Sequence, residues 1–185
     1  GRYPGADPGA GRDLVERLDV ALGDVAAAPG GQPVHGALDL VEAIPKPTLS
    51  LIKGFCVGGG CELSMATDIR IAAAGSRFGI PVARLGILVG YREMRRLVAL
   101  VGPGDASYLL LSGRLIDAEE AARIGLVSRV VPLDEIDGQA FELAREMASL
   151  APLSHRRHKL ILGTVQRNPS LEGLTPEEEG LPFTN

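Results

Sequence analysis

The stretch Ile52-Lys-Gly-Phe-Cys-Val-Gly-Gly-Gly-Cys-Glu-Leu-Ser-Met-Ala-Thr-Asp68 (IKGFCVGGGCELSMATD) joins an apolar strand to a helix-like segment through three consecutive glycines, Gly58–Gly60. Glycine adopts positive φ without steric cost and lets a ligand approach the backbone. At a strand-to-helix junction these glycines leave N–H groups facing a ligand, and the helix dipole adds partial positive charge there. The turn therefore predicts a binding site for an anion or for a carbonyl oxygen that becomes an oxyanion.

Two ligands compete for this turn, a phosphate and a carbonyl oxygen. Phosphate-binding loops usually carry a longer sequence motif than three glycines, and neither GxxxxGK[ST] nor GxGxxG is present. Glu62 follows on the first turn of the helix, where a carboxylate can exchange a proton with a bound carbonyl compound. The alternative is purely structural: Gly58–Gly60 would permit close strand–helix packing, and Glu62 would stabilise the helix N-terminus. For an isolated run of three glycines, that alternative is the commoner one.

The chain on both sides of this stretch alternates strands and helices. Hydrophobic spacing predicts strands over 48–54, 68–74 and 126–132, and helices over 34–44, 60–67, 92–101, 105–111, 133–150 and 153–167. A further short helix is indicated by Leu14, Leu18 and Leu22. Asp117 and Glu120 form a capping-box-like helix start, and 168–185 is composed of turn residues and acids. The alternation predicts an α/β protein.

Composition limits the classes of function. The 185 residues suit a single globular domain, and 19 basic against 23 acidic residues give a net charge of -4, which favours neither nucleic acid nor anionic lipid as a partner. No apolar run has the length that a membrane helix needs. Cys56 and Cys61 match no CxxC spacing and form no disulfide framework, which favours a reducing compartment, and we expect a cytoplasmic protein.

Several separated motifs resemble the crotonase superfamily, the enoyl-CoA hydratase/isomerase group. They are KPTLSLIKGFCVGGGCELSMATDIRIAAAGSRFGIPVARLGI, LVALVG and LLLSGRLIDAEEAARIGLVSRVV, which occur in the order expected for that family and cover about 45–165. The resemblance implies a spiral of β-β-α turns followed by C-terminal helices. It also implies a homotrimer or homohexamer, and a site in which two backbone N–H groups polarise the thioester carbonyl of an acyl-CoA or enoyl-CoA.

The same resemblance assigns roles to individual residues. The N–H of Gly59 is implied to be one donor to the thioester oxygen, with Gly58 and Gly60 also binding substrate. The second donor comes from an earlier loop, which GAGRDLVE at 9–16 resembles, so the N–H of Arg12 is preferred; the rival is PGAD at 4–7, with Ala6. No separate cofactor is implied, because coenzyme A is part of the substrate.

Glu62 matches the first of two glutamates that serve hydration in this family. The second follows the proline of FGxPE, whereas FGIPV places Val82 there, and valine cannot position or deprotonate water. Ordinary two-glutamate hydration is therefore in doubt, as is isomerisation that relies on the second position alone. Tyr91 and Glu93, in the next loop, are candidate reactive groups; the alternative for both is a solvated helix start.

The resemblance also sets expectations for the rest of the chain. It divides the chain into a partial crotonase-like α/β core over 1–132 and an incomplete helical region over 133–185, so that the sequence looks truncated at both ends. Lys159, in the basic run HRRHK, is a candidate for binding CoA phosphates. His155 and His158 lack a third ligand of suitable spacing, so no metal site is expected.

These expectations lead to two hypotheses of function. The first is an enoyl-CoA hydratase or isomerase that stabilises a thioester enolate in an oxyanion hole. The alternative is a catalytically weak or inactive relative that binds CoA esters or acts as an assembly subunit.

Overall fold

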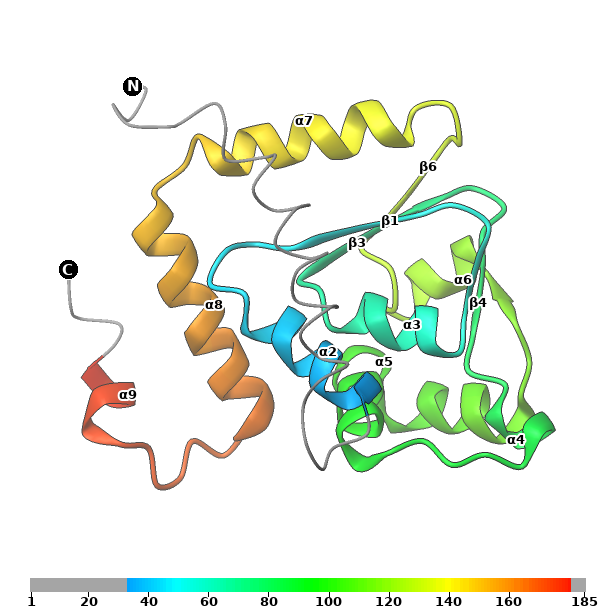
Figure 1. Ribbon diagram of the computed structural model, residues 1–185, viewed down its shortest axis with the longest axis horizontal. Helices are drawn as coiled ribbons and strands as arrows, with labels where there is room; N and C mark the ends of the chain where they lie inside the picture. Colours follow the sequence, from blue (N-terminus) through cyan, green and yellow to red (C-terminus); the bar gives the residue numbers. More distant parts are fainter. Residues whose placement is uncertain (1–32, 181–185) are drawn as a thin grey trace.

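The computed structural model describes residues 33–180, in which short strands build two small sheets (Figure 1). One sheet has the order β1 (Leu49–Ile52), β3 (Ile69–Ala73), β6 (Arg129–Val131), and the other has the order β2 (Phe55–Val57), β4 (Arg77–Gly79), β5 (Ile116–Asp117). The helices are α2 (Pro33–Ala43), α3 (Gly59–Met65), α4 (Val82–Leu85), α5 (Tyr91–Ser112), α6 (Ala118–Arg123), α7 (Ile136–Ala148), α8 (Pro152–Arg167) and α9 (Pro176–Gly180).

The first four strands alternate between the two sheets. β3 lies parallel to β1, with Leu49 opposite Ile69, and β4 lies parallel to β2, with Val57 opposite Gly79. Parallel neighbours need a crossover connection, and the connection from β1 to β3 passes through β2 and α3. Each β-β-α turn thus adds one strand to each sheet, which confirms the predicted α/β class and the coil of β-β-α turns.

A glycine separates β1, which lies within the strand predicted over 48–54, from β2, which the sequence did not predict. Gly54 has a φ of 82°, a left-handed conformation that ends β1 and redirects the chain into β2. The carbonyl of Gly54 accepts a hydrogen bond of 2.9 Å from the N–H of Arg77, which holds the bend against the start of β4. The strand predicted over 48–54 is thus confirmed, whereas β2 was missed because three residues are too few to show a strand pattern.

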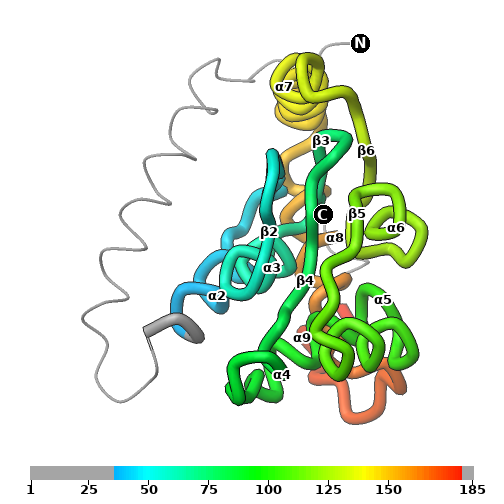
Figure 2. The backbone as a smooth tube through the Cα atoms, turned by 90° about the vertical axis from the view of Figure 1, so that its right-hand side faces the viewer, coloured from blue at the N-terminus to red at the C-terminus, as the bar shows by residue number. Residues whose placement is uncertain are grey.

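Three apolar clusters fill the interior. The largest packs α3, α5 and α6 against both sheets around Phe78, Leu97 and Leu126. A second lies between α7 and the sheet of β1, β3 and β6, and a third joins α2 to α3. Figure 2 shows α7 across one end of the molecule, with α4 and α5 toward the other. The predicted division into 1–132 and 133–185 stays a prediction, although α7 packs directly on the sheet.

Residues close to the helix ends determine where α6 begins and where α5 is interrupted. The side chain of Asp117 accepts a 2.8 Å hydrogen bond from the N–H of Glu120, which confirms the predicted cap of α6, while the carboxylate of Glu120 pairs with Arg123. α5 contains the predicted break, because Gly102 is non-helical and Pro103 follows it. The prediction of only turn structure after 168 was wrong, since α9 forms there.

An ion-pair network joins α2 to α5. The guanidinium of Arg96 is buried and contacts Glu42 at 2.5 Å, Asp39 at 2.7 Å and Glu93 at 3.5 Å, while Arg92 pairs with Asp39. Partial burial pushes the pKa of Glu42 up, but hydrogen bonds and charges from Arg96 and Arg95 outweigh it and lower this pKa below 4.5. The network therefore stabilises the ionised form of Glu42.

We expect the Glu42–Arg96 contact to make stability depend on pH. A pKa lowered in the folded state adds stability above the unfolded value of 4.5, and that stability is lost as the pH falls through the folded value. At neutral pH, Glu42→Gln should lower the free energy of unfolding by about 1–3 kcal/mol, because Arg96 loses a charged partner. Urea unfolding at several pH values would check this, and a deficit that does not shrink below pH 4.5 would contradict it.

Among the described residues, no helix is both long and apolar enough to cross a membrane.

Candidate active site at the glycine turn

The turn between β2 and α3 has a conformation that only glycine adopts readily. Gly58, the residue before the helix, has φ 57° and ψ -125°. Its N–H donates a hydrogen bond of 2.9 Å to the carbonyl of Gly79 at the end of β4. The predicted role of Gly58 in substrate binding stays a prediction, but its amide proton already bonds to the neighbouring strand. Gly58 thus fixes the turn in place.

Gly59 and Gly60 are the first two residues of α3 and present their backbone to open space. The first hydrogen bond within the helix runs from the N–H of Glu62 to the carbonyl of Gly58, at 3.0 Å. The N–H groups at the first positions of a helix have no acceptor inside it. A Cβ atom added at either glycine would meet nothing within 4 Å. The backbone at Gly59 and Gly60 is therefore exposed, and the predicted role of these residues in substrate binding stays a prediction.

Glu62 lies three residues after Gly59, on the same face of α3 and in its first turn. Its side chain is half-buried, and its negative charge contributes to raising the pKa of Cys61 beside it. A carboxylate one helical turn from exposed N–H donors can exchange a proton with a ligand bound to them. The structure thus brings Glu62 and Gly59 together on one face of the helix.

Val82 lies at the same end of the structure as the glycine turn. Because β2 and β4 run parallel with Val57 opposite Gly79, both chains leave the sheet at the same edge. After β4 the chain passes through Ile80 and Pro81 to Val82, the first residue of α4, which packs partly buried against the main core. An apolar side chain therefore occupies the position where the family resemblance expected a second carboxylate.

Tyr91 and Glu93, the two candidate reactive residues in the first turn of α5, have opposite environments. Tyr91 is 97% exposed, as expected for the solvated start of a helix. Glu93 is 2% exposed and contacts the Arg96 guanidinium at 3.5 Å, so a solvated helix start is wrong for this residue. Burial of a charged carboxylate requires a charged partner, which α5 supplies one turn later. Catalytic roles for Tyr91 and Glu93 stay predictions.

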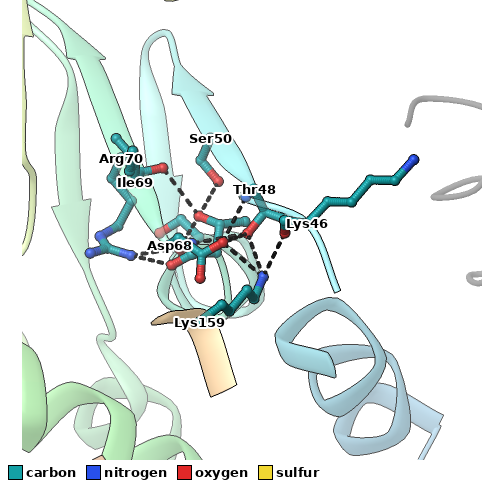
Figure 3. A network of polar contacts seen from close by, with 9 residues as sticks. Lys46, Thr48, Ser50, Asp68, Ile69, Arg70 and Lys159 are labelled. Carbon is teal, nitrogen blue, oxygen red and sulfur yellow. Dashed lines mark hydrogen bonds and ion pairs between the residues drawn. The ribbon is translucent and has the colours of Figure 1, made fainter. Parts of the chain in front are cut away.

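Lys159 is part of a polar network at the other end of α3 (Figure 3). Its ammonium group donates to the carboxylate of Asp68 at 2.7 Å and to the carbonyl of Lys46 at 3.0 Å. Asp68 also accepts hydrogen bonds from the N–H and hydroxyl of Thr48, at 2.6 and 2.8 Å. The network links α8 to the starts of β1 and β3, so Lys159 does not lie beside the glycine turn. Its role in substrate binding stays a prediction.

We expect Lys159→Met to destabilise the fold. The side chain of Lys159 is 13% exposed, and its removal leaves the Asp68 carboxylate without its cation. The expected loss is about 1–3 kcal/mol in the free energy of unfolding, measured with urea. Lys53→Met is a matched control, because Lys53 makes an equally short but solvent-exposed pair with Asp137 and should cost less than about 1 kcal/mol. Equal losses in the two variants would contradict a structural role for Lys159.

Arg70 has a role that its place in the sequence did not indicate. It lies in the strand predicted over 68–74, and its guanidinium is buried and donates to the carbonyls of Thr67 at 2.6 Å and Leu126 at 2.8 Å. Burial lowers the pKa of Arg70 from its usual value, although Asp68 opposes this shift. The side chain thus satisfies carbonyls just beyond the end of α3 and supports the helix that carries Glu62.

A groove of about 910 Å³ opens between α2, α5 and α8. Its walls include Met65 and Ala66 in the last turn and C-cap of α3, which places it at the opposite end of this helix from Gly59. The groove is therefore separate from the glycine turn. Arg12 and its rival Ala6 lie outside the described residues, so the second predicted donor has no structural counterpart within 33–180.

The described fold is a coil of β-β-α turns with an exposed glycine turn and a carboxylate in the first turn of the helix that follows it. Residues 9–179 match the Enoyl-CoA hydratase/isomerase family, and the chain belongs to that family.

Relatives and solved structures agree with this assignment. The chain is similar to the crotonyl-CoA hydratase of Syntrophomonas wolfei, at 44% identity over 65% of the chain and 46% of the relative. It is also similar to the short-chain-enoyl-CoA hydratase of Clostridium acetobutylicum, at 43% identity over 70% and 48%. An enoyl-CoA hydratase/carnithine racemase structure from Magnetospirillum magneticum superposes with a TM-score of 0.76, at 36% identity, over 82% of this chain and 55% of that one. The chain thus spans about half the length of these curated relatives.

Proposed function

We propose that this chain carries the oxyanion-binding and proton-transfer residues of an enoyl-CoA hydratase/isomerase. The observation that carries the proposal is the turn itself: Gly59 is exposed at the first position of α3, a Cβ added to it would meet nothing within 4 Å, and Glu62 lies one turn later on the same helix face. A donor fixed where negative charge develops on the thioester oxygen stabilises the enolate-like transition state. The half-buried carboxylate of Glu62 then moves the proton.

The family and its curated relatives support the choice of substrate. An acyl-CoA or enoyl-CoA thioester offers both a carbonyl oxygen for Gly59 and a proton for Glu62 to transfer, and the curated relatives in Syntrophomonas wolfei and Clostridium acetobutylicum are hydratases of enoyl-CoA substrates. The reaction is hydration and its reversal, or migration of the double bond. The N–H near Arg12 completes the oxyanion hole in this proposal, and the active species is a homotrimer or homohexamer located in the cytoplasm.

Val82 favours a second candidate function. An apolar side chain at this position cannot orient the water that hydration consumes, and it is held in place by the main core. A relative that binds CoA esters with little or no turnover, or that acts as an assembly subunit, fits this substitution. The two candidates share the glycine turn and differ in whether thioester chemistry follows binding.

A spectrophotometric assay separates the candidates. The purified chain is mixed with a short and a medium trans-2-enoyl-CoA, and loss of the conjugated thioester absorbance is followed while binding of the same thioester is measured by calorimetry. Loss of absorbance at catalytic protein concentration is expected for a hydratase. Binding without any loss of absorbance would exclude hydration and leave isomerisation or the binding function. A chain that is folded but binds no CoA ester would contradict both candidate functions.

A further inference from the structure

Gly79, the glycine of the motif FGIPV, lies beside the glycine turn. It ends β4 opposite Val57, and its carbonyl accepts the 2.9 Å hydrogen bond from the N–H of Gly58. Gly58 directly precedes Gly59, whose N–H is the proposed donor to the thioester oxygen. A shift of the Gly79 carbonyl is therefore passed to the turn through this hydrogen bond.

The other side of Gly79 is closed by the backbone that leads into β5. Gly79 is buried, and a Cβ atom built on it would lie 2.7 Å from Cδ2 of Leu115 and 2.9 Å from the carbonyl oxygen of Arg114. Nonbonded carbon atoms in ordinary contact are about 3.5–4.0 Å apart, so a side chain does not fit. The φ of Gly79 lies outside the left-handed range. Glycine is required here by the close approach of another backbone segment and not by its own conformation.

The segment 113–115 is fixed at both of its ends. Nε of Arg84, in α4, donates a 2.7 Å hydrogen bond to the carbonyl of Gly113, and β5 follows the segment directly and pairs with β4. The carbonyl of Arg114 belongs to the main chain and cannot rotate away as the end of a side chain can. A side chain at position 79 is thus expected to displace the end of β4. Because the sheet order is β2-β4-β5, displacement away from β5 is toward β2 and the glycine turn.

We propose that Gly79 is a positioning residue for the oxyanion donor. The lack of a side chain lets β4 bring the Gly79 carbonyl to the amide of Gly58, which fixes the direction of the N–H of Gly59. The effect on catalysis rests on the proposed function, whereas the geometry of the turn does not. The alternative is that this glycine only permits close packing of β4 against 113–115. Both interpretations expect a cost in stability when a side chain is added, and only the positioning role expects a specific change at the turn.

Gly79→Ala tests this role, with Gly163→Ala as the matched control. A Cβ atom at Gly163 would also lie too close to a neighbour, 2.9 Å from Nη1 of Arg167, but that guanidinium ends a flexible side chain on α8. Hydrogen exchange of the Gly58 amide, followed by NMR in the full chain without ligand, reports the turn directly. Gly79→Ala should speed this exchange by at least about tenfold more than that of the amides of β3, which lies in the other sheet. Gly163→Ala should leave it unchanged.

A bound thioester gives the second readout. A hydrogen bond to the carbonyl oxygen lowers the stretching frequency of that carbonyl, so infrared spectra of bound butyryl-CoA, labelled with ¹³C at the carbonyl, report whether the donor is aligned. In Gly79→Ala we expect this shift to shrink and turnover of trans-2-butenoyl-CoA to fall by about 10–100-fold. The calorimetric affinity for butyryl-CoA should change by less than about threefold, because a misaligned oxyanion donor affects the transition state more than the bound ligand.

A second variant covers the case in which Gly79→Ala does not fold. Leu115→Ala removes the Cδ2 atom that a Cβ at position 79 would meet first, and it leaves the carbonyl of Arg114 in place. Leu115 is 40% exposed, so its truncation should be tolerated. The double variant Gly79→Ala/Leu115→Ala should therefore fold, and it should still show fast exchange at Gly58 and a reduced carbonyl shift.

Three outcomes would overturn the positioning role. One is unchanged exchange at Gly58 in a folded Gly79→Ala chain, and another is a full carbonyl shift with full turnover in that chain. The third is that the single and the double variant both fail to fold while Gly163→Ala folds, since Gly79 would then serve packing alone. A wild-type chain that binds butyryl-CoA without any carbonyl shift would instead contradict the proposed function. Exchange at Gly58 needs no ligand, so it would still test whether Gly79 fixes the turn.

Discussion

Glu62→Gln is expected to reduce turnover of an enoyl-CoA by about 10²–10⁴-fold, the usual contribution of a general acid or base. Glutamine keeps the length and much of the shape of the side chain but cannot accept or release the proton. Because Gly59 keeps its N–H, binding of the thioester should change little. Steady-state rates with a trans-2-enoyl-CoA, combined with calorimetric affinity for a saturated acyl-CoA, would measure both parts.

A matched substitution controls for the electrostatics of the helix start. Glu119 is an exposed carboxylate in the first turn of α6, so Glu119→Gln removes the same kind of charge from the same part of a short helix. This control should leave turnover within about twofold, since surface substitutions rarely change stability by more than about 0.5 kcal/mol. Equal activity of the Glu62→Gln variant and the wild-type chain would remove Glu62 from the proton-transfer role.

Gly59→Pro is expected to reduce the rate of the chemical step by about 10²–10³-fold, because it deletes the proposed oxyanion donor. Proline is well tolerated at the first position of a helix, where the missing N–H has no acceptor within the helix. Gly59 is that position in α3, and a Cβ atom there meets nothing within 4 Å. The substitution therefore removes one hydrogen-bond donor with little expected change in the packing of the turn.

Gly59→Ala is the control for this variant. Alanine adds a Cβ atom but keeps the N–H, and the φ of Gly59 lies outside the left-handed range, so the turn should form normally. The alanine variant should retain most of the wild-type turnover, and thermal unfolding should show both variants folded. If the alanine and proline variants were slowed equally, the N–H of Gly59 would not be the donor.

The sequence predicted the features that depend on local chemistry. The glycine turn, the helix carrying Glu62, the cap at Asp117 and the break at Gly102 all result from residues close together in the chain. The sequence predicted β1 within 48–54 but missed β2 and the change of sheet at Gly54, because a strand of three residues is too short to show a periodic pattern.

The contacts that could not be predicted from the sequence are mainly those between segments far apart in the chain. Arg70 and Glu93 are charged residues whose neighbours in the sequence are typical of exposed positions. Both are buried, because Arg70 donates a hydrogen bond to the distant carbonyl of Leu126 and Glu93 pairs with Arg96 one helical turn later. Lys159 is tied to Asp68, a residue 91 positions earlier.

The loops that connect the paired parallel strands differ in the conformational entropy lost when each loop is closed. Thr48 contacts Asp68 across a separation of 20 residues just before β1 and β3, whereas Arg70 within β3 contacts Ser128 before β6 across 58. With closure cost growing as 1.5 RT ln n, the longer loop costs about 1 kcal/mol more. The segment that contains the glycine turn and Glu62 is therefore closed by the loop with the smaller entropic cost.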